Sequence, residues 1–274
     1  SRAGAKVVVI TAKDKLRQLL SAGLDGLCFS AEQEGQHVYS AALSEHVLRR
    51  GVEIMQSHAP DLMYLSTSDY VQHTHPPGST EANRFYAAVD RELEKLNRLG
   101  ARLVITADHG MNAKTDAWGR PRVRFLQTLL DQWFGTGACL VILPITDPYV
   151  VHHGSLGSFA SVYRVSDVDT SEIVRRLSEV TGVELVLERS VACRRLELPY
   201  DRTADVVVCA DRGTVLGSRP DDHDLAALHA PLRSHGGLAE REVPLLWNSE
   251  HFRFEVTKSL RNYDAFWIGL NSAN

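Results

Sequence analysis

The chain has 274 residues, a net charge of -4 and 44% hydrophobic residues, which is ordinary for a globular protein with one large or two smaller domains. The weak negative charge gives no electrostatic reason to expect binding to nucleic acid or to an anionic membrane. The uncharged apolar runs are of strand length, far below the roughly 20 residues that a membrane-spanning helix needs. We therefore expect neither nucleic acid nor a membrane as a partner.

The four cysteines are widely spaced and form no CxxC pair, so neither a disulfide framework nor a cysteine-based zinc site is indicated. Reduced thiols are the simpler interpretation, and they favour a cytoplasmic location. These residues are Cys28, Cys139, Cys193 and Cys209.

The first half of the chain alternates between strand and helix patterns. Residues 6–11 (KVVVIT) form a short β-branched run that predicts a buried strand, and residues 61–67 (DLMYLST) predict another. Residues 41–57 have the pattern of a helix, for which Ser44 is the expected cap.

A long helix follows, beginning at a cap formed by Ser79 or Thr80 and ending at Gly100. Residues 101–107 (ARLVITA) predict a third buried strand. Strand, helix and strand at this spacing form a βαβ unit, which implies a parallel sheet covered by helices. Ligands of such sheets collect at the carboxyl ends of the strands.

The pattern changes after Gly110, where shorter strands surround a helix that runs from Ser171 to Gly182. The expected strands are residues 139–143, 149–151, 160–165, 184–188 and 205–210. We predict an α/β fold with a mostly parallel sheet and an inserted α+β cap lobe. The metal-binding core would comprise residues 1–115 and 232–274, and the lobe residues 116–231.

Metal-ligand side chains follow two of the predicted core strands. Asp69 and His73 are four residues apart, so one helical turn would place both on the same face. Asp108 and His109 end the third strand, where adjacent ionisable residues are unusual without a function. His235 stands before two glycines near the C-terminus. Carboxylate and imidazole ligands suit zinc or a similar divalent ion, and two clusters suggest a two-metal site for phosphoryl chemistry.

The remaining histidines carry a weaker signal. His75 stands before two prolines and is expected in an exposed loop. His152 and His153 are adjacent, and because neighbouring side chains of a strand point to opposite faces, at most one could serve a given site.

Three segments, TSDYVQHTHPPG, TADHGM and SHGGLAEREVP, resemble in this order the alkaline phosphatase superfamily, and within it the phosphonoacetate hydrolases. ITAKDKLRQLL and VHHGSLGSFA resemble the same enzymes, so the likeness spans nearly the whole chain. The resemblance implies two Zn²⁺ ions, although the ligands would also accept Mn²⁺ or Fe²⁺. It assigns Asp69, His73 and His235 to one ion, and Asp108 and His109 to the other.

The resemblance also implies that Lys13 and Lys15 approach the anionic substrate, and two ammonium groups at a strand end can neutralise a phosphonate or a carboxylate. The resemblance to the phosphonoacetate hydrolases implies a further Asp ligand and a Thr nucleophile, from segments that precede the counterpart of KVVVITAKDK. Nothing in these 274 residues matches those segments, and Thr11 stands in the wrong context. We therefore expect that the chain begins inside the domain, and we assign no catalytic nucleophile.

The implied reaction is the hydrolysis of phosphonoacetate to acetate and phosphate through that Thr nucleophile. Two alternatives stay open: a nucleotide pyrophosphatase or phosphodiesterase of the same superfamily, and a truncated metal-binding fragment without turnover. The expected partner is a small anionic substrate. The metal, the substrate range and the oligomeric state, for which a homodimer is one option, are not determined by the sequence.

Overall fold

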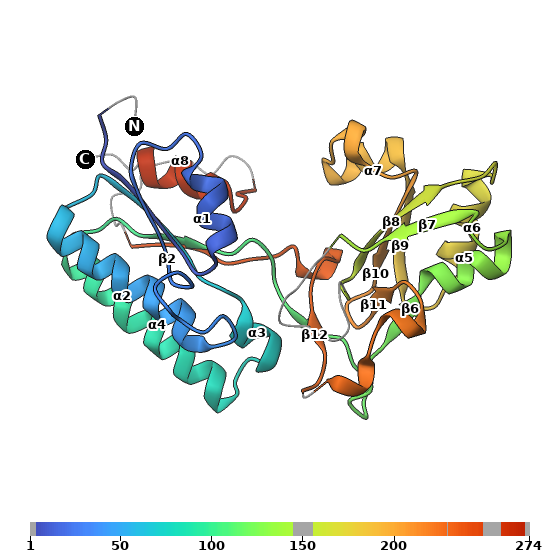
Figure 1. Cartoon of the computed structure of the whole chain (residues 1–274), viewed down its shortest axis with the longest axis horizontal. Helices are drawn as coiled ribbons and strands as arrows, with labels where there is room; N and C mark the ends of the chain where they lie inside the picture. Colours follow the sequence, from blue (N-terminus) through green and yellow to red (C-terminus); the bar gives the residue numbers. More distant parts are fainter. Residues whose placement is uncertain (1–3, 145–155, 229, 249–258, 272–274) are drawn as a thin grey trace. The chain divides into compact units, whose positions relative to one another are not determined.

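The structure, a computed structural model, describes residues 4–144, 156–228, 230–248 and 259–271. Its contacts divide the chain into two compact units (Figure 1). The first unit comprises Ser1–Ala107 and Pro244–Asn274, and the second comprises Asp108–Val243. The predicted lobe, residues 116–231, falls within the second unit. The predicted strand at residues 149–151 and the pair His152 and His153 lie outside the described residues.

The first unit contains a parallel sheet, in the strand order β2 (Leu27–Ser30), β1 (Val7–Thr11) and β3 (Leu62–Ser66). Both strands predicted in this region, at residues 6–11 and 61–67, are therefore confirmed. The edge strand β2 was not predicted.

Helices cover both faces of this sheet, with α2 and α4 on one side and α1 and α8 on the other (Figure 1). Val8 and Ile10 of β1 pack with Leu43 and Val47 of α2 in one buried cluster. On β3, Tyr64 stacks on Phe266 of α8, with 6.2 Å between the ring centroids. Burial from both sides explains why β1 reads as a continuous apolar run. The helices are α1 (Asp14–Ser21), α2 (Ala41–His58), α3 (Tyr70–Thr74), α4 (Thr80–Arg98) and α8 (Asp264–Asn271).

The caps of the two long helices differ from the prediction in one case. Ser79 caps α4 by accepting a hydrogen bond from Ala82 N, as predicted. The prediction that Ser44 caps α2 is wrong, because Ser40 accepts from Leu43 N and has the extended backbone of a cap. Ser44 lies one turn inside the helix on its buried face.

The predicted strand at residues 101–107 is shorter than expected and has another partner. In the described part of the chain, β4 (Val104–Thr106) pairs in antiparallel fashion with β13 (Leu245–Trp247). Asn248 fixes this pairing, since its Oδ1 accepts from Leu103 N at 2.8 Å and its Nδ2 donates to Ala101 O at 2.9 Å. The sequence had placed this strand beside residues 61–67 in the parallel sheet.

The second unit contains an antiparallel sheet in the order β7 (Cys139–Ile142), β8 (Phe159–Arg164), β10 (Val206–Ala210) and β9 (Val183–Glu188). These strands confirm the predictions at residues 139–143, 160–165, 184–188 and 205–210.

Alternate residues of β10 face different helices, which follows from the two-residue period of a strand. Val206 and Val208 belong to the cluster that includes α5 (Leu126–Phe134) and α6 (Thr170–Ser178). Val207 and Cys209 pack instead with Ala192 of α7 (Arg189–Leu196). The central strand is therefore buried on both faces.

Two smaller ladders complete the second unit. One is the parallel pair of β6 (Val123–Phe125) and β11 (Val215–Gly217), and the other is the antiparallel pair of β5 (Asn112–Ala113) and β12 (Arg233–Ser234). Short 3₁₀ turns comprise Tyr200–Arg202, Pro220–Asp222, Leu225–Ala227 and Leu238–Glu240. The fold is thus α/β, with a parallel sheet and helices in one unit and antiparallel sheets in both.

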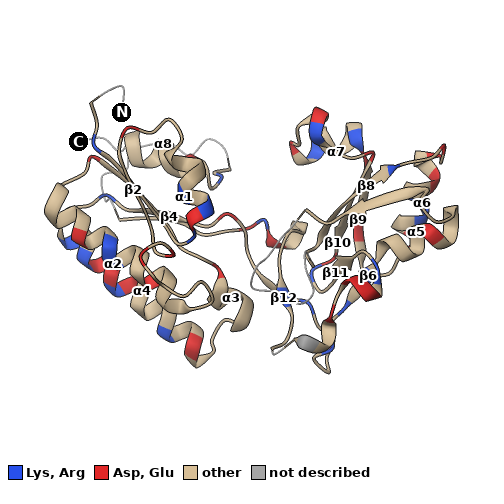
Figure 2. Cartoon of the chain, viewed as in Figure 1, with Lys and Arg blue, Asp and Glu red and all other residues tan. Residues whose placement is uncertain are grey.

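Residues of both charge signs are interspersed along α2 and α4 (Figure 2). On α4 they form ion pairs along the helix, between Glu92 and Lys95 and between Glu94 and Arg98. The pair of Glu94 and Arg98 lies on a solvated helix face, whereas the Glu92 side chain is only 13% exposed. Of the helices that the structure describes, none has the length and apolar character needed to cross a bilayer.

Candidate metal centre

The carboxyl ends of β1 and β3 carry the predicted site residues of the first unit. The two strands are parallel neighbours, with Thr11 opposite Ser66, and Ala12 N extends the pairing by donating to Ser66 O at 2.7 Å. Lys13 follows β1 and Asp69 follows β3, so both lie at the same edge of the sheet. The parallel pairing of β1 with β3 therefore brings these two residues to one place.

Asp69 and His73 form a pair with the geometry of two ligands of one cation. Asp69 is the cap residue of α3, and His73 lies one turn along that helix and is buried. His73 Nε2 lies 3.1 Å from Asp69 Oδ2. Zinc bonds of about 2.0–2.2 Å at tetrahedral angles would separate two ligand atoms by roughly 3.3–3.5 Å. The pair fits a divalent ion after only a small adjustment.

The carboxyl group of Asp69 is held in its ionised form. Burial is the largest influence and raises its pKa, but the hydrogen bond and charge of His73 and the charge of Lys13 outweigh it. The pKa of Asp69 is lowered to about 2 as a result. The influence of Lys13 also indicates that this lysine and Asp69 interact electrostatically at the sheet edge.

Ser44 supports the loop that carries Asp69, which the sequence did not indicate. Ser68 N donates to Ser44 Oγ at 2.9 Å, and Ser44 Oγ lies 3.2 Å from Ser68 O. Both serines are buried. A helix-interior serine that bonds the residue before Asp69 fixes the start of α3 against α2. The only signal of this role in the sequence is a polar residue on the apolar face of a predicted helix.

The other predicted residues near this edge differ in their exposure to solvent. Lys13 is half-buried at the start of α1, whereas Lys15 is exposed on that helix. Thr11 is fully buried, and its Oγ1 donates to Lys13 O at 2.9 Å. A buried hydroxyl with this bond is unsuited to act as a nucleophile, and Thr11 therefore has no catalytic role. His75 is half-buried rather than exposed.

In the second unit, the ladder of β5 and β12 brings His109 and His235 together. His109 lies before β5 and His235 directly follows β12, so antiparallel pairing places both at the same end of the ladder. Their imidazole rings stack with 3.6 Å between the centroids and 7° between the planes. Cations of a two-metal site lie about 3.5–4 Å apart. Two parallel rings at this spacing can each serve a different ion.

The surroundings of His109 match those of a metal ligand. Its Nδ1 lies 3.0 Å from Gly110 O, and a ring N–H donated to a carbonyl leaves the other ring nitrogen, Nε2, for a cation. Asp108 Oδ2 lies 3.7 Å from His109 Nε2. Asp108 Oδ1 accepts from His109 N at 3.1 Å, which orients the carboxylate. Carboxylate oxygen and imidazole nitrogen are ligands that zinc accepts.

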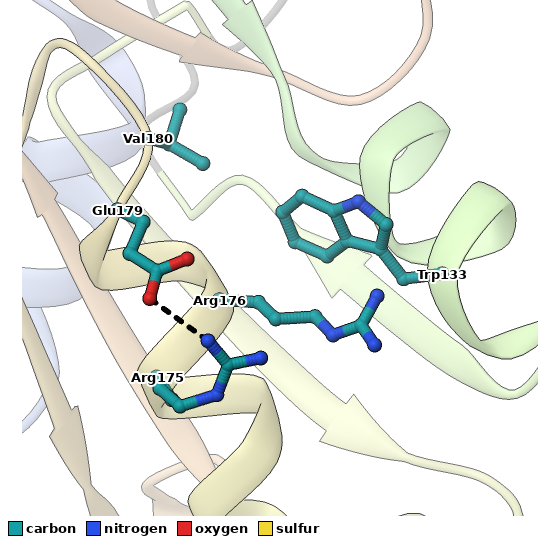
Figure 3. A pocket seen from close by; sticks show the side chains of 5 residues that line it. All are labelled: Trp133, Arg175, Arg176, Glu179 and Val180. Atoms are coloured by element: carbon teal, nitrogen blue, oxygen red, sulfur yellow. Dashed lines mark hydrogen bonds and ion pairs between the residues drawn. The ribbon is translucent and has the colours of Figure 1, made fainter.

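The second unit also has a shallow hollow lined by Trp133, Arg175, Arg176, Glu179 and Val180 (Figure 3). Arg175 is bonded to Glu179 at 2.8 Å, and the guanidinium of Arg176 lies 5.8 Å from the centroid of the Trp133 ring. None of the predicted metal or substrate residues lines it.

Residues 26–238 match the profile of the family described as type I phosphodiesterase / nucleotide pyrophosphatase, which is more than half of the chain. The chain belongs to this family. A phosphonoacetate hydrolase from Sinorhizobium meliloti 1021 is 49% identical, with a TM-score of 0.93, and was solved in complex with phosphonoformate and with phosphonoacetate. The alignment covers 99% of this chain and 72% of the solved chain. The predicted resemblance to phosphonoacetate hydrolases is thereby confirmed.

A murine ectonucleotide pyrophosphatase / phosphodiesterase 5 is more distant, at 18% identity and a TM-score of 0.58, over 92% of this chain and 62% of the solved chain. This likeness extends to the fold alone.

Proposed function

We propose that this member of the type I phosphodiesterase / nucleotide pyrophosphatase family is a metal-dependent hydrolase that cleaves the carbon–phosphorus bond of phosphonoacetate. The observation that carries the proposal is the 49% identity, over 99% of the chain, to a hydrolase solved with phosphonoacetate. The products are acetate and phosphate.

Asp69, His73 and His235 are the proposed ligands of one cation, since an aspartate and two histidines are a donor set that zinc accepts. Asp108 and His109 are proposed as ligands of a second. Three features support this division: the family resemblance, the spacing of Asp69 and His73, and the parallel rings in the second unit. Zn²⁺ is the proposed metal, with Mn²⁺ and Fe²⁺ as alternatives. Such a pair of cations supplies charge that offsets the negative charge developing on phosphoryl oxygens.

The side chains of the chain itself have separate tasks in this scheme. Asp69 is ionised at neutral pH and therefore offers a full negative charge as a ligand. His109 donates a hydrogen bond from Nδ1 to Gly110 O, which holds the ring in one orientation. Lys13 and Lys15 are proposed to bind the phosphonate or the carboxylate of the substrate, because two ammonium groups compensate its charge. The Thr nucleophile implied by the resemblance is assigned to no residue of the printed sequence.

The release of phosphate from phosphonoacetate, measured beside the cleavage of a p-nitrophenyl phosphodiester, tests the proposal. We expect faster turnover of phosphonoacetate, and we expect a chelator to abolish it. Faster cleavage of the diester would favour a phosphodiesterase instead. Stoichiometric zinc binding without turnover of either compound would favour a metal-binding fragment.

A further inference from the structure

A buried ion pair contacts the segments that carry the two stacked histidines of the second unit. Lys114 Nζ and Glu240 Oε1 are 2.9 Å apart, and their side chains are 0% and 1% exposed. Nζ also donates to Ser158 Oγ at 2.7 Å and to Arg212 O at 3.0 Å. These bonds use all three N–H groups of an ammonium. Burial lowers the pKa of Lys114, whereas the hydrogen bond and the charge of Glu240 oppose that effect.

Glu240 contacts both segments that carry the histidines. Its Oε2 accepts from Gly237 N at 2.9 Å, two residues after His235. Its backbone oxygen accepts from Gly110 N at 2.6 Å, directly after His109. Its Oε1, besides accepting from Lys114, accepts from Asn112 Nδ2 at 2.6 Å. One residue therefore ties the two loops to each other.

Lys114 reaches the His235 segment through a second branch. Ser158 Oγ accepts from Lys114 Nζ and donates to Thr214 O at 2.7 Å. Ser158 N donates to His235 O at 2.8 Å. The ion pair is thus connected to the His235 segment at two points. Lys114 reaches the carbonyl of His235 through Ser158, and Glu240 binds Gly237 on the C-terminal side of His235.

We propose that Lys114 and Glu240 are positioning residues that hold His109 and His235 in the parallel arrangement needed by two cations; this rests on the proposed function. The ladder between them, β5 with β12, has two residues in each strand, which is short for fixing two side chains at a ligand spacing. A charged carboxylate can bind an ammonium, an amide and a backbone N–H together, and no apolar side chain can do so. The pair would act on the metal ligands and would not touch the substrate.

The test is the metal affinity of Glu240→Gln, measured by titrating the metal-free full chain with Zn²⁺. This variant keeps the size of the side chain and loses its charge. Outer partners of metal ligands typically contribute about 10–100-fold in affinity, so we expect a weakening of at least tenfold. The KM for phosphonoacetate should change less than threefold, and saturating zinc should restore much of the lost kcat.

Asp205→Asn is the matched control, because it removes the ion pair of Asp205 with Arg189 at 2.9 Å in the same unit. Its zinc affinity should equal that of the wild type. The double variant Lys114→Met with Glu240→Leu removes both charges without leaving either unpaired. Its melting temperature without metal reports folding, and we expect its zinc affinity to fall by at least tenfold although it folds.

The outcomes separate two claims. Wild-type zinc affinity in Glu240→Gln would overturn the positioning role while leaving the proposed function intact. If the wild-type chain itself binds no zinc, the metal centre fails, and the positioning role fails with it. If the double variant does not fold, Glu240→Gln alone decides between these results.

Discussion

The two units hold their candidate ligands in different ways. In the first unit, Asp69 and His73 lie where a parallel strand passes into a short helix, so the backbone topology alone brings them to the edge that also carries Lys13. In the second unit, His109 and His235 lie beside a minimal ladder, and a buried ion pair joins their loops. The first arrangement follows from a local pattern, whereas the second depends on residues that are far apart in sequence.

The largest expected effect is the loss of a ligand in the first unit. Asp69→Asn removes a charge that a cation would bind, and we expect phosphate release from phosphonoacetate to fall by about 10³-fold, equivalent to roughly 4 kcal/mol. Asp90→Asn is the control, since Asp90 is exposed on α4. A fall of less than tenfold in Asp69→Asn, with the control unaffected, would contradict the assignment of this residue.

The two buried thiols of the second unit should be less reactive than the partly buried thiol of the first unit. Cys209 lies on the central strand β10, and burial raises the pKa of its thiol to about 11. At pH 8 its thiolate fraction is then about a hundredfold lower than that of an ordinary thiol. Burial also raises the pKa of Cys139. Cys28, on the edge strand β2, and Cys193, on α7, are only partly buried.

A thiol reagent at pH 8, followed by mass mapping, measures this difference. We expect Cys28 to react within the folded protein, and Cys139 and Cys209 to react only after unfolding. The thiolate fraction of Cys209 should increase as the pH rises towards 11, because burial raises the pKa of this thiol to about 11. Rapid labelling of Cys209 at pH 8 would show that the sheet of the second unit is open.

Substrate binding should depend on the lysines of the first unit. Lys13→Ala removes a charge next to the Asp69 edge, and we expect the KM for phosphonoacetate to increase by about 10–50-fold, or roughly 1.4–2.3 kcal/mol. Lys6→Ala is a suitable control, because Lys6 is exposed and precedes the same strand. Steady-state kinetics at saturating zinc would measure both. Equal KM values for the two variants would remove Lys13 from the substrate site.

The smallest expected effect concerns helix α4 of the first unit. Ser79→Ala removes the bond to Ala82 N and should lower the free energy of unfolding by about 1 kcal/mol. Urea unfolding measures this change.

Ser44→Ala should instead disturb the Asp69 loop, because Ser44 Oγ accepts a hydrogen bond from Ser68 N and caps no helix. A cap-sized loss of stability with unchanged zinc affinity in Ser44→Ala would contradict that role.

In both units, the elements with a strong local pattern could be predicted from the sequence, among them the four strands of the second unit's sheet. The strands at residues 6–11 and 61–67 are continuous apolar runs, and Ser79 and Gly100 delimit α4 by local chemistry. Helix α1 was not predicted: Leu16, Leu19 and Leu20 share one side of it, but the helix is short and has no buried residue. Helix α8 is far in sequence from the strands that it covers, and its apolar residues have no clear helical period.

The site shows the same division between local and distant signals. Asp69 and His73 are four residues apart, and their spacing predicted the geometry that the structure has. Lys114 and Glu240 are separated by 126 residues, so no pattern in the sequence relates them. Ser44 was misinterpreted for a related reason, because its partner Ser68 lies on another element. Contacts between residues that are far apart in sequence become visible only in the structure.

The number of zinc ions bound per chain tests the central claim most directly. Equilibrium dialysis with metal analysis would compare the wild type with Asp69→Asn from the first unit and His109→Ala from the second. We predict two ions for the wild type and one for each variant, with two retained in Asp90→Asn. A wild-type chain that binds no zinc, or variants that bind as much as the wild type, would contradict the two-cation centre.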